Sequence, residues 1–202
     1  LEERAPMCGV PFHAAETYIK RLIEKGYKVA ICEQVEDPKK AKGLVKREVI
    51  RVVTPGTTLD AASLDETKNN YLMSVVSVED QFGCAIADIT TGDCFVTEVG
   101  TPAKLLDEIN KFVPAEIICN DAFLMSGIDT EDLKERMGIC VFSLDPWYFD
   151  DSLCQRTLKE HFHVNQLEGL GLEDYDSGVI AAGALFVYLQ ETQKTALSHM
   201  AT

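Results

Sequence analysis

Three strand-like runs follow one another between residues 71 and 99, and this arrangement constrains the fold more than any other feature of the sequence. The runs are 71–78 (YLMSVVSV), 84–90 (CAIADIT) and 94–99 (CFVTEV), joined by the short turns 80–83 and 91–93. Both turns contain glycine. Short glycine-containing loops between such runs are typical of antiparallel hairpins, so the sequence predicts a three-stranded meander.

After residue 100 the pattern changes to an alternation of helices and strands. The predicted elements are a helix at 102–112, a strand at 115–119, a helical stretch at 121–136, a strand at 139–144 and helices at 150–162 and 176–191. The last helix is apolar on almost all sides, which is typical of a buried helix. The order βββαβαβα, with an antiparallel start and later crossovers, predicts an α/β fold of the ribonuclease-H-like kind, a mixed sheet flanked by helices.

A smaller α/β unit is predicted ahead of this domain. Its elements are a helix at 14–25, a short buried strand at 27–32, a basic loop at 37–43 and a strand at 45–54. Pro55 and Gly56 then set a turn. The predicted domain boundary lies between residues 55 and 68.

The charge of the chain divides at the same place. The 202 residues carry a net charge of −14, which by itself argues against nucleic acid as a partner. However, residues 1–53 hold 11 Lys and Arg against 8 Asp and Glu, a net +3, whereas residues 54–202 hold 8 against 25, a net −17. This asymmetry favours two units with different partners, the alternative being one solvated acidic face beside a neutral one.

The seven cysteines predict a reducing compartment. Their number is odd, no pair forms a C-x-x-C motif, and most of them lie in apolar runs, so buried reduced thiols in a cytoplasmic protein are expected. No run approaches the ~18 apolar residues that a membrane span needs. The chain opens without an initiator methionine or a signal-peptide pattern, and we expect it to be a piece of a longer protein.

Asp88 is the strongest candidate for a metal ligand, because ribonuclease-H-like nucleases carry a metal-binding acid on their first strand. Two-metal chemistry needs several converging carboxylates. The best substitutes for the others are Asp145, Asp150 and Asp151, which lie beyond a strand end. A structural or turn-capping Asp88 is therefore favoured, and a metal-dependent nuclease that uses Asp88 is the alternative.

No other pattern predicts catalysis or metal binding. His161 and His163 stand two residues apart at a predicted helix end, where they point to different sides. The glycines of 169–171 are followed by acidic residues, and no P-loop motif occurs in the sequence. We therefore expect no catalytic residue and no metal ligand in this chain.

Basic residues cluster between positions 39 and 51. They are Lys39, Lys40, Lys42, Lys46, Arg47 and Arg51. Such side chains pair with phosphates when a loop reaches a groove, and the alternative is an ordinary solvated loop. The rigid apolar segment 6–11 includes Met7, which either wedges against DNA bases or, as the residues alone favour, packs within the protein.

Several long motifs carry a resemblance to a known family. They are 4–13 (RAPMCGVPFH), 26–35 (GYKVAICEQV), 46–57 (KREVIRVVTPGT), 87–92 (ADITTG), 114–117 (PAEI) and 192–195 (TQKT). In this order they resemble bacterial MutS, the family of DNA mismatch-recognition proteins. The resemblance covers essentially the whole chain.

The resemblance implies a layout. It gives 1–56 as the C-terminal part of the mismatch-binding domain, 57–66 as a linker, 67–185 as the ribonuclease-H-like connector domain and 186–202 as the start of the core or lever domain. By motif match, Met7 and Arg47 fall where members of the family approach the DNA, and Lys46 lies beside them, so these three are the expected DNA-binding residues. The family's Phe-x-Glu mismatch motif lies upstream of Leu1, so weak mismatch specificity is expected.

The resemblance also implies partners. The longer protein is expected to bind mispaired double-stranded DNA through residues 1–56 and to recruit MutL through the connector. It is further expected to form a homo-oligomer and to work in the bacterial cytoplasm near the nucleoid. ATP and magnesium would act in an ATPase domain outside this chain, so the chain itself needs no cofactor and is not an enzyme.

Overall fold

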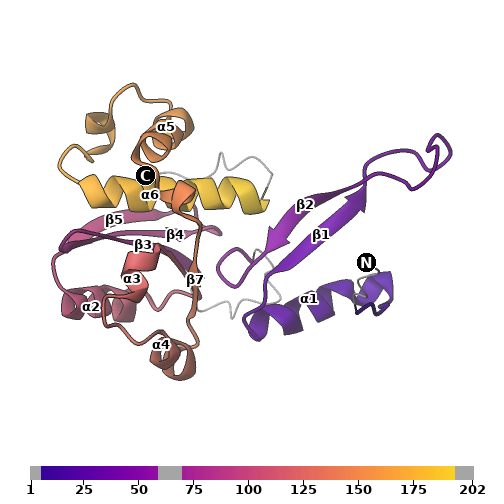
Figure 1. Ribbon diagram of the computed structural model, residues 1–202, viewed down its shortest axis with the longest axis horizontal. Helices are drawn as coiled ribbons and strands as arrows, with labels where there is room; N and C mark the ends of the chain where they lie inside the picture. Colours follow the sequence, from indigo (N-terminus) through magenta and orange to yellow (C-terminus); the bar gives the residue numbers. More distant parts are fainter. Residues whose placement is uncertain (1–5, 59–69, 194–202) are drawn as a thin grey trace, which may run out of the picture.

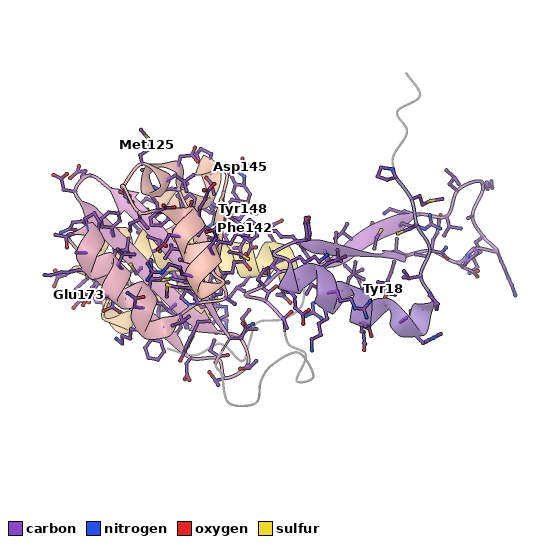
Figure 2. The ribbon with its side chains drawn as sticks, turned by 90° about the horizontal axis from the view of Figure 1, so that it is seen from below. Tyr18, Met125, Phe142, Asp145, Tyr148 and Glu173 are labelled. Atoms are coloured by element: carbon purple, nitrogen blue, oxygen red, sulfur yellow. The ribbon has the colours of Figure 1, made fainter. Side chains whose placement is uncertain are left out.

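The computed structural model describes residues 6–58, which form an extended arm, and residues 70–193, which form a sheet domain (Figure 1). The elements of the arm are η1 (Phe12–Ala14), α1 (Ala15–Glu24), β1 (Val29–Gln34) and β2 (Arg47–Val53). The β1–β2 hairpin and α1 run side by side away from the sheet domain (Figures 1 and 2).

The sheet domain is built on five strands. They are β3 (Tyr71–Val78), β4 (Gln81–Asp88), β5 (Cys94–Val99), β6 (Glu116–Cys119) and β7 (Cys140–Ser143). Their order is β5-β4-β3-β6-β7, with antiparallel pairing from β5 to β3 and parallel pairing from β3 to β7. This mixed sheet confirms the predicted ribonuclease-H-like fold class.

Helices cover both faces of the sheet. They are α2 (Pro102–Phe112), α3 (Asp121–Leu124), α4 (Thr130–Met137), η2 (Pro146–Phe149), α5 (Asp151–Phe162), η3 (Leu167–Leu170) and α6 (Asp176–Gln193). Helices α2, α3 and α4 pack on the face that carries Met73 and Ile117, whereas α5 and α6 pack on the face that carries Leu72 and Ile118. The strict alternation along each strand therefore divides the core into two layers.

Helix α6 begins against a carboxylate from the neighbouring sheet. Glu98 on β5 accepts hydrogen bonds from Ser177 Oγ and from the Gly178 amide, both at 2.8 Å. The first amides of a helix have no partner within the helix, and the helix dipole favours negative charge at that end. Glu98 therefore anchors the start of α6 on the edge strand.

Replacing Glu98 by alanine is expected to lower the free energy of unfolding by about 1–2 kcal/mol, since both hydrogen bonds at the helix start are lost. Urea denaturation followed by circular dichroism measures the change. Glu135→Ala, on the exposed side of α4, is the control and is expected to stay within about 0.5 kcal/mol. Equal losses in the two variants would contradict the anchoring role.

Two predicted elements differ from the structure. The strand expected at 27–32 is β1 at Val29–Gln34, and most of its residues are exposed rather than buried, because α1 accompanies only one face of the hairpin in the described part of the chain. The helical stretch expected at 121–136 is two helices, α3 and α4. They separate because the Asp129 carboxylate accepts hydrogen bonds from the Glu131 and Asp132 amides and starts a new helix.

The first meander turn is also tighter than predicted. Val78 pairs with Gln81, so the loop is only Glu79 and Asp80, and β4 starts three residues earlier than expected.

Among the described helices, none is long and apolar enough to cross a membrane.

Candidate nucleic-acid interface

The arm is an antiparallel hairpin that points away from the sheet domain. Its strands pair from Val29–Val53, next to that domain, to Gln34–Arg47 at the outer end, a span of about 17 Å. The register shifts in the middle of β1, where a β-bulge leaves Ile50 of β2 without a direct partner.

The two faces of the hairpin have different surroundings. Ile31, Arg51 and Val53 line a cavity of about 340 Å³ together with side chains of α1, so their face is turned toward α1. Side chains of paired residues point to the same face of an antiparallel ladder. Following the pairing across the bulge, Arg47 lies on the opposite face, turned away from α1 and the cavity.

Five of the six clustered basic residues are exposed on the loop between β1 and β2 or at the start of β2. They are Lys39, Lys40, Lys42, Lys46 and Arg47. This loop is the outer end of the arm (Figure 1). Arg51 does not belong with them: it is half-buried beside the cavity, and its Nε atom is buried without a hydrogen-bond partner in the described structure.

Lys46 is engaged within the arm. Its Nζ atom lies 2.6 Å from Oε1 of Glu48, and its amide donates a hydrogen bond to Glu36. The hydrogen bond that the Lys46 ammonium donates to Glu48, with the attraction of the same carboxylate, raises the pKa of Lys46. Arg47 forms no salt bridge with any residue in the described ranges, so its charge is the more available of the two.

Met7 is exposed, so the packing that the sequence favoured for it is not found. Its exposed fraction is 97%, as is that of Phe12 in η1. In Figure 1 the segment before α1 lies toward the outer half of the arm, as the β1–β2 loop does. The three predicted DNA-binding residues therefore come from two segments that share the outer part of the arm.

Asp88 has the turn-capping role that the sequence favoured. Its Oδ1 atom accepts hydrogen bonds from the amide and hydroxyl of Thr90, the amide at 2.8 Å, and from the Thr91 amide. It pairs with Tyr71 at the start of β3, whereas Asp145 follows the far end of β7, which runs parallel to β3 through β6. The two carboxylates therefore lie at opposite ends of the strands of this sheet and cannot share a metal ion.

The other acidic and histidine motifs have structural roles. The Asp150 carboxylate accepts a hydrogen bond from the Leu153 amide and caps α5. The His161 ring lies 4.4 Å from the Phe186 ring, and His163 ends the helix in a left-handed conformation. Within the described residues, no group of three or more potential metal ligands comes together.

The thiols only partly follow the prediction. All seven cysteines are free, and Cys84, Cys119 and Cys154 are buried as expected. Cys8 and Cys32, both in the arm, are exposed instead. Their apolar neighbours in the sequence predicted a core that the described part of the arm does not build around them.

The sequence did not predict the buried polar cluster that lies where the arm meets the sheet domain. Glu116, the first residue of β6, is fully buried, and it contacts Gly56 of the arm and Tyr188 of α6. The available signal was a single acid at the start of the apolar run 115–119, which is unusual for a core strand unless the charge is paired.

Comparison with known proteins gives two family matches. The model described as MutS domain I matches residues 1–62, and the model described as MutS domain II matches residues 70–201.

Curated relatives match along nearly the whole chain. A DNA mismatch repair protein MutS from Lachnoclostridium phytofermentans is 60% identical over 98% of the chain, and one from Ruminiclostridium cellulolyticum is 51% identical over 99%. One from Caldanaerobacter subterraneus is 45% identical over 98%. The aligned segment is 21–23% of each relative, so the chain spans about a fifth of their length.

Proposed function

Because this chain belongs to the MutS family, we propose that it is the DNA-proximal and connector segment of a longer mismatch repair protein. In this layout residues 1–56 are the C-terminal part of the mismatch-binding domain, 57–66 a linker, 67–185 the connector domain and 186–202 the start of the core or lever domain. The matched ranges of the two family models support the division after the arm.

The proposed DNA contact is made by the outer end of the arm, through Arg47, Lys46 and Met7. The observation that carries this proposal is the set of exposed basic side chains at that end, on a unit whose net charge is +3 in a chain of −14. Phosphate contacts from such side chains position a protein on a duplex without reading its sequence. Arg47 faces away from α1 and is free of salt bridges within the described residues, so we assign it the main phosphate contact.

Replacing Arg47 by glutamine in the full-length protein is expected to weaken DNA binding equally across sequences. Loss of one phosphate contact lowers the slope of log K against log salt by about 0.9. Lys46→Gln is expected to have a smaller effect, because Glu48 already holds the ammonium group. Fluorescence anisotropy with labelled duplexes over a salt series measures both slopes.

The matched control is Arg156→Gln, which removes an exposed arginine from α5 in the sheet domain. Its salt slope is expected to equal that of the unmodified protein. An unchanged slope for Arg47→Gln, or an equal drop in the control, would remove Arg47 from the DNA interface.

We further propose that the sheet domain serves a protein partner. Residues 54–202 carry a net charge of −17, which repels the DNA backbone. The connector would contribute the contact with MutL. ATP and magnesium would act in an ATPase domain elsewhere in the longer protein. That protein would be a homo-oligomer that works in the bacterial cytoplasm near the nucleoid. The segment itself has no catalytic role in this proposal, and the turn-capping contacts of Asp88 support that assignment.

A further inference from the structure

The inner end of the arm is embedded in the sheet domain. The sequence predicts residues 54–57 as a boundary turn, yet all four are buried. The turn is closed by the Thr57 amide bonding to the Thr54 carbonyl at 3.1 Å, and the two threonine hydroxyls lie 2.8 Å apart. A boundary turn that is both closed and buried does not behave as a free linker.

The contact between this turn and the sheet domain centres on the carboxylate of Glu116. Its Oε2 atom accepts a hydrogen bond from the Gly56 amide at 2.8 Å, and its Oε1 atom accepts one from the Tyr188 hydroxyl at 2.5 Å. The residue has no exposed surface. A buried carboxylate is costly unless hydrogen bonds and charge compensate for the lost water. The two hydrogen-bond partners of Glu116, Gly56 and Tyr188, come from different segments of the chain.

Lys28, directly before β1 at the inner end of the arm, supplies a positive charge that compensates the negative charge of Glu116. Its Nζ atom lies 4.0 Å from the centre of the Phe142 ring and 5.0 Å from that of Tyr188. Loss of water around the ammonium group lowers the pKa of Lys28, and the attraction of Glu116 opposes that change. Figure 2 shows Phe142 on the side of the sheet domain that meets the arm.

The contact between the 54–57 turn and the sheet domain, called the joint below, leaves no room for a larger residue at Gly56. A β-carbon added to Gly56 would lie 2.9 Å from Cβ of Glu116 and 3.0 Å from Cδ1 of Leu72. Two further hydrogen bonds span the junction, from Asn70 Nδ2 to the Pro55 carbonyl at 3.2 Å and from Gln193 Nε2 to the Val52 carbonyl at 3.5 Å.

We propose that Glu116 locks the arm to the sheet domain in one orientation, through Gly56 and Lys28 on the arm side and Tyr188 on the α6 side. If the arm leaves, the Glu116 carboxylate loses its amide donor and the nearby cation, while Glu116 itself stays in β6. The docked orientation of the arm is therefore favoured electrostatically. A displacement of the arm would act on Glu116 at the start of β6 and on Tyr188 in the last turns of α6. This inference rests on the contacts alone and holds whether or not the arm binds DNA.

The test measures the orientation of the arm and the opening of the joint. Spin labels are placed on Cys32 of the arm and on a cysteine introduced by Glu135→Cys in α4. Cys8→Ser removes the other exposed thiol, and Cys140→Ser removes the partly exposed one. With the joint unmodified, pulsed electron paramagnetic resonance is expected to give one narrow peak in the distribution of distances between the two spin labels. Lys28→Met and Tyr188→Phe are expected to broaden it and to speed hydrogen exchange of the Gly56 amide at least about tenfold.

The matched controls are Lys25→Met, an exposed lysine near Lys28, and Tyr175→Phe, whose side chain is partly exposed. Both are expected to keep the narrow peak and the slow exchange. If Tyr188→Phe unfolds the sheet domain, the surface substitution Lys28→Met decides the outcome. A broad peak in the unmodified protein, or unchanged peak and exchange in Lys28→Met, overturns the lock.

Discussion

Gly183→Ala is expected to lower the free energy of unfolding by about 3 kcal/mol or more. A β-carbon at this position of α6 would lie 2.2 Å from Cβ and 2.4 Å from Cα of Cys154 in α5. Unbonded carbon atoms pack at about 3.5–4.0 Å, so the two helices would have to separate by about 1 Å or more. The better helix propensity of alanine returns only about 1 kcal/mol. Urea denaturation followed by circular dichroism at 222 nm gives the change.

Gly100→Ala is the matched control for this substitution. Among the described residues, no atom lies within 4 Å of a β-carbon added at Gly100, so the free energy of unfolding is expected to change by less than about 0.5 kcal/mol. If Gly183→Ala proves as stable as this control, α5 and α6 do not pack as closely as described.

Alkylation of the native chain at pH 8 is expected to divide its thiols sharply. Cys8 and Cys32 are exposed and are expected to react within minutes. Burial raises the pKa of Cys84, Cys119 and Cys154 to about 12 each, and that of Cys94 likewise. About one in ten thousand of these groups is then a thiolate at pH 8, so their reaction is expected to be slower by about a thousandfold or more.

Mass spectrometry of iodoacetamide-treated protein counts the modified thiols over time. Cys140 is partly exposed, and its pKa is raised mainly by burial, so it is expected to react at an intermediate rate. In guanidinium chloride all seven thiols should react alike. Protection of Cys32 in the native chain would show that β1 is covered, and rapid loss of Cys154 would show that α5 opens readily.

Local signals explain why most elements of the sheet domain could be predicted. The helix expected at 102–112 is α2 at Pro102–Phe112, because Thr101 caps its start and Pro102 suits the first turn. Leu105 and Ile109 then recur on the buried face. The order of these elements also determines the fold class, since antiparallel hairpins and parallel crossovers leave few arrangements of one sheet.

Contacts between distant residues explain what could not be predicted. Pro55 and Gly56 predict a turn near the domain boundary, but a turn dipeptide carries no information on its contact with Glu116, which lies 60 residues further along the chain from Gly56. Likewise, the apolar run at 27–32 predicts burial, but burial of a hairpin depends on what covers each of its faces. The candidate DNA-binding residues came from motif resemblance, and the exposure of the outer end of the arm supports them.

The bulge in the hairpin has a consequence for which arginine can meet a ligand. Arg47 and Arg51 are four residues apart, so in an unbroken strand both would sit in phase and project together. The one additional residue at Ile50 shifts that phase by half a period, which sends Arg51 inward and Arg47 outward. A single backbone irregularity thus turns Arg51 toward the cavity and leaves Arg47 facing away from it.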